Sequence, residues 1–348
     1  MKKFLTLFFV LLLSLTTIFA FTACDKEKDD DTTAYSLYAP DGAPALSVAR
    51  LLHDENALPF LDVNIVEAST IQTYVTGETP KADFAIMPVN AANKLLGSGE
   101  KYQLLGTVTH GNLFLMKNTF KDDNLADVTP STINVLIGKK VGVINLANVP
   151  GLTFKAILAD NNIEYKDISE SGDVDENKVN LKGLANGTEV VPASDCDYFV
   201  VPEPAATTKQ NATQGKLSIA ASLQDLYGQE GGYPQAVLVV KKQIASSDIE
   251  NMVKVLDSFA QNESWLKAQT TKTEDIVNAV VSGFVKEDTA PTFTANNLNA
   301  TVIENCAISF ERLTNQNKGK IENYINKLNA ISNNAWGSVK QEFLYIPE

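Results

Sequence analysis

Two stretches of the chain share one pattern of hydrophobic and polar positions. Each has an apolar run that stops at a proline and is followed at once by small, helix-forming residues. In the first stretch residues 84–87 end at Pro88, and in the second residues 198–201 end at Pro202. A buried strand, a tight turn and the start of a helix are predicted at both places. The chain is therefore expected to contain two halves built on one plan.

Smaller signals agree with this repeat. Asp83 and Asp197 stand directly before the two apolar runs, and Pro44 and Pro150 each follow another predicted strand. In open parallel sheets, ligands bind where the carboxyl ends of strands meet the N-termini of helices. Two such sheets facing one another would enclose a cleft between them.

Strand and helix patterns alternate along the chain, which favours parallel sheets with crossover helices. Strands are expected at 34–39, 61–67, 83–87, 103–108, 140–145, 164–168, 197–201, 217–221, 236–240 and 306–310. Helices are expected at 42–53, 70–76, 88–96, 131–137, 150–161, 178–185, after Pro202, and at 246–269, 273–284, 296–305 and 317–331.

Two segments are expected to cross between the halves: an extended stretch at 107–116, broken by Gly111, and a return at 231–235. The C-terminal third of the chain is expected to support the first half. These expectations place the first lobe at 34–109 and 239–348, and the second lobe at 110–238.

The first 33 residues differ from the rest of the chain. Two lysines and the apolar run 4–13 precede small residues and Cys24, which is typical of a secretory leader spanning 1–23. This leader resembles a bacterial lipoprotein signal, in which Cys24 would be lipidated; an ordinary cleavage site with an incidental cysteine is the alternative. Residues 24–33 are charged and read as a solvated tether. The expected location is the outer face of the cell membrane, held through Cys24.

Composition excludes several functions. The formal net charge of −13 argues against nucleic acid as a partner, because phosphate contacts need clustered lysine and arginine. The two arginines, Arg50 and Arg312, lie outside the predicted turns, so a bidentate arginine grip on an anion is unsupported. No motif for a metal, a phosphate or a catalytic serine is found, and neither a cofactor nor a catalytic residue is predicted. Buried free thiols are favoured for Cys196 and Cys306, and a disulfide between them is the alternative.

Polar and small residues at the predicted turns are the candidate ligand contacts. Asp41 precedes a helix start, where its carboxylate either caps the helix or faces the cleft. Gly42 and Ala43 lack bulk, so their backbone N–H groups would allow close approach of a ligand. Asn90 and Asn148 stand near the start of a helix in each half, where each either supports that start or contacts the ligand.

Four further candidates lie at the second turn and in the crossings. Glu203 precedes Pro204 and stands at the N-cap position of a helix, although glutamate is not a preferred cap. His110 and Asn112 belong to the first crossing, and Tyr233 in the return would stack on a planar ligand or pack the hinge. With Asp41 and Glu203 facing the cleft, a small neutral or cationic polar solute is favoured; a small sulfonate held by helix N-termini is the alternative.

Taken together, the segments 38–46, 83–92, 109–113, 201–206 and 302–306 resemble those of solute-binding lipoproteins of ABC importers, in the nitrate/sulfonate/taurine and thiamine-precursor-like branch. The resemblance implies an α/β, two-lobed, type II periplasmic-binding fold, each lobe a mostly parallel sheet flanked by helices, with two hinge crossings that close on a solute. It also implies an ABC permease as partner, a monomeric protein and no enzymatic activity. The alternatives are a ligand-sensing lipoprotein that docks a receptor, and an enzyme on the same fold, of the menaquinone or pyrimidine biosynthesis type.

Overall fold

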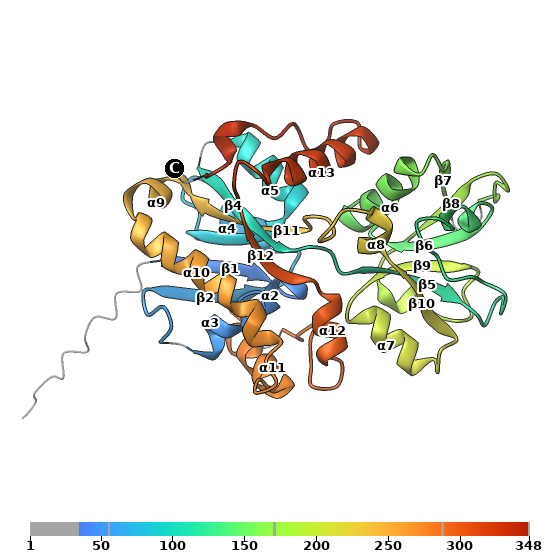
Figure 1. The fold of residues 1–348 in the computed structure, drawn as a ribbon, viewed down its shortest axis with the longest axis horizontal. Helices are drawn as coiled ribbons and strands as arrows, with labels where there is room; N and C mark the ends of the chain where they lie inside the picture. Colours follow the sequence, from blue (N-terminus) through green and yellow to red (C-terminus); the bar gives the residue numbers. More distant parts are fainter. Residues whose placement is uncertain (1–34, 55, 100, 170–171, 287–288, 347–348) are drawn as a thin grey trace, which may run out of the picture. The chain divides into compact units, whose positions relative to one another are not determined.

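The computed structural model describes residues 35–346 apart from 55, 100, 170–171 and 287–288. The predicted leader, the tether and Cys24 lie outside the described residues. Across the described residues, two mixed sheets of six strands are flanked by helices (Figure 1). The predicted α/β class with two lobes is therefore confirmed. Every helix of this described part is too short or too polar to span a bilayer.

The first lobe is built on a sheet with the strand order β12-β4-β11-β3-β1-β2. Strands β1, β2 and β3 run parallel, whereas β11 is antiparallel to both β3 and β4. Its strands are β1 (Tyr35–Pro40), β2 (Leu61–Val66), β3 (Phe84–Pro88), β4 (Tyr102–Thr109), β11 (Ala236–Lys241) and β12 (Ile308–Arg312). Its helices are α2 (Ala43–Leu46), α3 (Ala49–His53), α4 (Ile71–Val75), α5 (Val89–Ser98), α9 (Lys242–Ser247), α10 (Ile249–Leu266), α11 (Thr273–Ser282) and α12 (Ala300–Asn305).

The second lobe repeats this plan with the strand order β10-β5-β9-β6-β8-β7. Its parallel strands are β6, β7, β8 and β9, and β5 runs antiparallel to β9. The strands are β5 (Leu113–Asn118), β6 (Lys140–Ile144), β7 (Tyr165–Ile168), β8 (Val179–Leu184), β9 (Tyr198–Pro202) and β10 (Leu217–Ser222). The helices are α6 (Val149–Asp160), α7 (Ala205–Ala212) and α8 (Leu223–Tyr227), with 3-10 turns η1 (Ile133–Leu136) and η2 (Gly187–Glu189).

Asp83 and Asp197, which precede β3 and β9, make equivalent hydrogen bonds in the two lobes. In the first lobe Asp83 Oδ2 accepts a hydrogen bond from the backbone N–H of Ser36, and Asp83 pairs with Lys241, each within 2.9 Å. In the second lobe Asp197 Oδ2 accepts from the backbone N–H of Lys140 at 2.7 Å. Each carboxylate therefore fixes the start of the neighbouring parallel strand, so the repeat seen in the sequence extends to the polar contacts of the fold.

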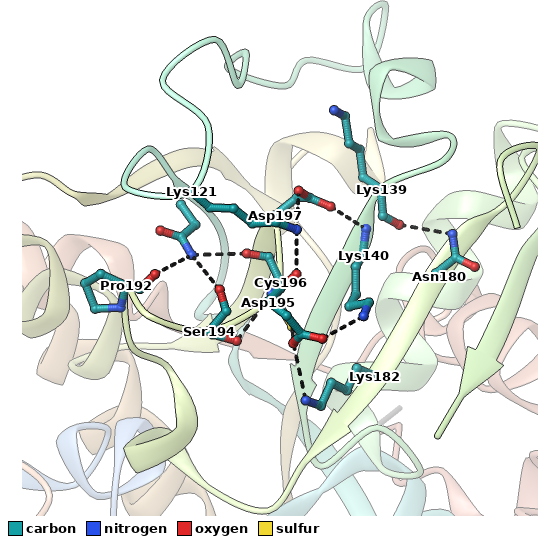
Figure 2. Close-up of polar contacts among 11 residues, drawn as sticks. Lys121, Lys139, Lys140, Asn180, Lys182, Pro192, Ser194, Asp195, Cys196 and Asp197 are labelled. Atoms are coloured by element: carbon teal, nitrogen blue, oxygen red, sulfur yellow. Dashed lines mark hydrogen bonds and ion pairs between the residues drawn. The ribbon is translucent and has the colours of Figure 1, made fainter. Parts of the chain in front are cut away.

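Figure 2 shows how the second of these aspartates is held. Lys121 pairs with Asp197 at 2.7 Å, while Asp195 pairs with Lys140 at 2.6 Å and with Lys182 at 3.4 Å. These side chains cluster at the start of β6 and β9, the strand ends opposite to those that carry the prolines. A charge-assisted hydrogen bond is about twice as strong as a neutral one. The cluster therefore holds the first residues of β6 and β9 in place beside one another.

The predicted helix at 178–185 is wrong, because these residues form β8, which pairs in parallel with β6 and β7. Val179 and Leu181 alternate with Asn180, a polar residue that nonetheless is fully buried. Its side-chain amide donates to the carbonyl oxygen of Asp175 at 3.0 Å and accepts from the N–H of Asp175 at 2.8 Å. The strand was missed because Asn180, whose side chain is buried and fully hydrogen-bonded to the backbone of Asp175, interrupts the apolar run that would otherwise indicate a strand.

Two predicted helices differ in form. The helix expected at 42–53 is divided into α2 and α3, because Ser47 Oγ donates to the carbonyl oxygen of Pro44 at 2.6 Å and the first turn ends there. The helix expected at 131–137 is the single 3-10 turn η1. Neither difference alters the strand order, since both segments connect strands without joining a sheet.

The C-terminal helix α13 (Lys318–Ile331) contacts α5 of the first lobe and α6 of the second (Figure 1). The prediction that the C-terminal third of the chain supports the first lobe is correct for α9 to α12. It is incomplete for α13, which also contacts the second lobe. Thr153 on α6 donates its hydroxyl proton to the carbonyl oxygen of Val149, so Tyr324 on α13 is the donor in their 2.6 Å hydrogen bond. Tyr324 also stacks on Tyr233, with ring centroids 5.5 Å apart. The helix therefore ties the lobes together.

The chain passes between the sheets at two places. Residues 110–112 join β4 to β5, and residues 228–235 join α8 to β11. A Cβ atom at Gly111, where φ is 105°, would lie 2.8 Å from both Gln224 Cγ and Tyr233 Cζ, so glycine is required by close approach as well as by conformation. Because β11 starts at Ala236, the expected boundary at 238/239 falls inside that strand.

Candidate functional site

A cavity of about 630 Å³ lies where the strands of both sheets end. The first lobe contributes Pro88 at the end of β3 and Thr109 at the end of β4. The second lobe contributes the turn after β6, with Asn145 and Asn148. Trp336, which follows α13, completes the lining. Of the two turns that define the repeat, the one at Pro88 lines the cavity and the one at Pro202 does not, whereas Pro44 and Pro150, the second pair of prolines, both line it.

Four side chains that line the cavity hold a buried polar atom with no hydrogen-bond partner within the described residues. These atoms are Asn90 Oδ1, Thr109 Oγ1, Gln235 Oε1 and Trp336 Nε1. Asn90 is 4 % exposed and Thr109 is 1 % exposed. A buried polar group left unpaired costs about 1–3 kcal/mol. All four residues line this one cavity.

Two helices present their first turns to the same cavity. Pro88 stands at the N-cap of α5, and Asn148 at the N-cap of α6; neither side chain caps its helix. Asn90 and Pro150, in the first turns, also line the cavity. The first backbone N–H groups of a helix have no partner inside it, and the helix dipole makes them good donors to acceptor atoms. The site therefore offers backbone donors as well as side-chain acceptors.

Gln235 lies at the junction of several elements. Its N–H donates to the carbonyl oxygen of Thr109 at 2.9 Å, and its carbonyl oxygen accepts from the N–H of Val89 at 3.0 Å. Its side-chain Nε2 donates to Asn112 Oδ1 at 2.8 Å. The sequence prediction placed Gln235 only in the return crossing; the available signal was its position directly before a strand, at the edge where the predicted sheets face one another.

Trp336 is held in the cavity wall by two buried asparagines. Asn93 Nδ2 donates to the carbonyl oxygen of Trp336 at 2.7 Å, and Asn329 Oδ1 accepts from its N–H at 3.1 Å. Both asparagines also donate to the carbonyl oxygen of Gly337. The sequence prediction missed Trp336 because it lies in a loop far along the chain from every predicted turn.

The two carboxylates that were expected to face the cleft are engaged elsewhere. Asp41 accepts hydrogen bonds from Gly42 N at 2.8 Å, Thr292 N at 2.9 Å and Thr292 Oγ1 at 2.6 Å. Glu203 is buried and accepts from Thr207 Oγ1 at 2.6 Å and from Asn305 Nδ2 at 2.7 Å. Neither lines the cavity, and in the described part of the chain its lining contains no charged side chain.

The other predicted contacts lie around the site. Among the predicted site residues, the cavity lining brings together Asn90 and Asn148. Gly42 and Ala43 precede Pro44, which does line it, and the side chain of Asn112 contacts Gln235. Fully buried Tyr233 stacks on Tyr324 of α13 and lines neither this cavity nor the recess beside His110. Whether each residue contributes to binding stays a prediction.

His110 belongs to a second, wider recess of about 790 Å³, which shares no lining residue with the first. Gln224, Glu263 and Glu304 also line it. Burial lowers the pKa of His110 below the ordinary 6.5, so the ring is neutral at physiological pH. His110, Gln224 and Gln229 of this recess also hold buried polar atoms without a partner among the described residues. The strand-end cavity is the better candidate because two of its polar lining residues, Asn90 and Thr109, are themselves at most 4 % exposed and because it lies where the strands of both sheets end.

Cys196 and Cys306 are buried and free, as predicted. Burial raises the pKa of both thiols, so neither is a nucleophile in the folded protein. Over residues 35–346, with the gaps given above, no group of three histidine, cysteine, aspartate or glutamate side chains is placed to hold a metal ion.

Comparison with models of protein families gives no match, and no curated protein sequence matches. Several solved structures do resemble this chain in fold. An ABC transporter protein from Parabacteroides distasonis has a TM-score of 0.68 at 16% identity, covering 91% of this chain and 99% of its own. The periplasmic aliphatic sulphonate binding protein of Escherichia coli has a TM-score of 0.62 at 11% identity, covering 90% and 92%.

The chain has the fold of ABC-importer binding proteins. A third example is the ligand-binding component of an ABC-type import system from Staphylococcus aureus, whose structure has zinc bound. Its TM-score is 0.55 at 12% identity, covering 90% of this chain and 96% of its own. At these identities the likeness concerns the fold, and the sulphonate and the zinc belong to those proteins.

Proposed function

We propose that this protein captures a small polar solute between its two lobes and delivers it to the permease of an ABC importer. The observation that carries the proposal is the cavity at the strand ends, where Asn90, Thr109, Gln235 and Trp336 present unpaired buried atoms. Relieving four such atoms, at about 1–3 kcal/mol each, is of the same order as the about −8 kcal/mol of micromolar capture. Binding of this kind needs no covalent chemistry.

The solute that fits is a small uncharged polar molecule. A cationic solute was favoured from the sequence on the expectation that Asp41 and Glu203 face the cleft, but both carboxylates are engaged outside the cavity lining. A small sulfonate is the alternative, since the first turns of α5 and α6 offer backbone N–H donors. Asn90 and Asn148 are the proposed direct contacts, and Gly42 and Ala43 lead into Pro44, which lines the cavity beside them.

The proposed location is extracytoplasmic, with a lipid anchor at Cys24, as the leader-like residues 1–23 and the tether support. The permease and the membrane are the proposed partners, and the protein is proposed to act as a monomer. An enzyme on this fold is less well supported, because both thiols are buried and His110 lies outside the cavity.

The proposal is tested with a thermal-shift panel of neutral polar metabolites, amines and sulfonates, followed by calorimetry on each compound that stabilises the protein. We expect one-to-one binding, weakened about tenfold or more in Asn90→Ala. Asn56→Ala, at an exposed asparagine, is the matched control and should bind as the unaltered protein does. Failure of every compound to bind, or equal affinity in Asn90→Ala, would contradict the proposed function.

A further inference from the structure

We propose that Gln235 makes the site selective for solutes that donate a hydrogen bond, and that Asn112 is the positioning residue that sets this selectivity. The inference rests on the proposed function and goes further, because it names the chemistry that the solute must carry. Its evidence is the contact between the two crossings, where Gln235 Nε2 donates to Asn112 Oδ1 at 2.8 Å.

This contact decides which end of the Gln235 amide the cavity receives. An amide side chain has a donor end and an acceptor end. Because Asn112 occupies the donor end, the end of the Gln235 amide left for a solute is Oε1, which is buried in the cavity wall and has no partner within the described residues. Gln235 lines the cavity, whereas Asn112 does not. Asn112 therefore acts on the solute through Gln235.

The same contact joins the lobes. Asn112 is 6 % exposed, and its carbonyl oxygen accepts from the N–H of Glu203 in the second lobe at 3.0 Å. Gln235 is bound through its backbone to Thr109 and Val89 in the first lobe. The orientation of the Gln235 amide is thus fixed from both sides of the hinge, so it is set before the solute arrives.

The rest of the cavity agrees with a donor-bearing solute. Asn90 Oδ1 is a second unpaired acceptor, and Thr109 Oγ1 is able to accept as well. Trp336 Nε1 is a donor without a partner in the described part of the chain, and it suits one carbonyl or ether oxygen. The solute class is therefore an uncharged molecule with at least two N–H or O–H donors and one acceptor, such as an amide, a lactam heterocycle or a sugar.

A sulfonate does not meet this requirement, because all of its oxygens are acceptors. Against Gln235 Oε1 and Asn90 Oδ1 it would leave both atoms unpaired, which costs about tenfold in affinity for each. The backbone N–H groups at the starts of α5 and α6 and the indole N–H of Trp336 pair with sulfonate oxygens, but no lysine, arginine or histidine lines the cavity among the described residues to add a positive charge. The inference therefore separates this protein from the sulphonate-binding proteins whose fold it shares.

The first experiment measures affinity by calorimetry for probes that differ only in their donors. The pairs are uracil with 1,3-dimethyluracil, and nicotinamide with N,N-dimethylnicotinamide; ethanesulfonate and propanesulfonate are the acceptor-only anions. We expect at least one parent compound to bind, and its methylated partner and both sulfonates to bind at least tenfold more weakly. Tighter binding of a sulfonate or of a methylated partner would overturn the inference and leave the proposed function standing. Binding of no probe here and no compound of the wider panel would overturn both.

The second experiment tests the role of Asn112 with the bound parent probe and its methylated partner. Gln235→Leu should lower affinity for the parent about tenfold and remove its preference over the partner. Asn112→Leu should also remove the preference, whereas Asn112→Asp should keep it, because a carboxyl oxygen still accepts from Gln235 Nε2. Gln243→Leu, at an exposed glutamine on α9, is the matched control. If Asn112→Leu keeps the full preference, Asn112 does not position the amide.

Discussion

Gly151, the third residue of α6, lies against the turn that lines the cavity. A Cβ atom at this position would lie 2.5 Å from the carbonyl carbon of Leu146 and 2.6 Å from its Cα, and closer still to its carbonyl oxygen. Ordinary contacts of this kind are 3.4–4 Å. The atoms in the way belong to the backbone, so no side-chain rotation relieves the clash. Gly151→Ala must therefore push the start of α6 away from the turn at 145–148.

The expected cost follows from two opposing effects. Overpacking of a well-packed region costs about 1–3 kcal/mol, and a rigid backbone neighbour places Gly151→Ala near the upper end. Replacing glycine by alanine inside a helix returns about 0.5–1 kcal/mol. The net loss of unfolding free energy is therefore about 2 kcal/mol. Solute affinity should fall as well, because Asn148 and Pro150 line the cavity and move with the helix.

Urea denaturation measures this loss, with Gly319→Ala as the matched control. Gly319 is the second residue of α13, and a Cβ atom there meets no atom within 4 Å in the described structure. Gly319→Ala should therefore be neutral or stabilising by about 0.5–1 kcal/mol. If Gly151→Ala proves as stable as Gly319→Ala, the close packing of α6 on the cavity turn is refuted.

Three further predictions concern buried groups. Tyr324→Phe removes the hydrogen bond to Thr153 and should cost about 1 kcal/mol in urea denaturation, since Thr153 keeps its own acceptor; no loss would contradict the tie between α13 and α6. Burial lowers the pKa of His110 in the folded protein, so below pH 6.5 the unfolded chain binds a proton that the folded protein does not. The contribution of neutral His110 to the free energy of unfolding is therefore fully present above pH 6.5 and is lost as the pH falls below 6.5 towards the folded-state pKa. Unfolding free energy should thus fall more steeply below pH 6.5 in the unaltered protein than in His110→Gln, and parallel curves would refute this. Cys196 and Cys306 should react with a thiol reagent only after unfolding; rapid native labelling would show that they are accessible.

Much of the fold could be predicted from the sequence, because buried parallel strands leave a strong local signal. The apolar runs before Pro88 and Pro202 marked β3 and β9, and the shared aspartates before them indicated the repeat. Strand β8 escaped prediction because Asn180, satisfied by the backbone of a neighbouring turn, stands inside it. The position of α13 across both lobes depends on Tyr324 and on contacts that have no local signature.

The site was predicted less completely than the fold. Asn90 and Asn148 were predicted because the strand-end argument specifies where a helix begins, and both line the cavity; their contact with a solute stays a prediction. Asp41 and Glu203 satisfied the same argument, but their partners lie 251 and 102 residues away, at Thr292 and Asn305, and such contacts are invisible in a single sequence. Gln235 and Trp336 enter the cavity from segments remote in the chain, and only the folded arrangement reveals them.

A crystal structure of the protein with the tightest-binding probe of the panel tests the central claim most directly. We predict density for one molecule in the cavity at the strand ends, in hydrogen-bond contact with Asn90 and Gln235 and bounded by Trp336. Density in the wider recess beside His110 and Gln224 instead, or on a surface outside both, would contradict the assignment of the solute to the strand-end cavity.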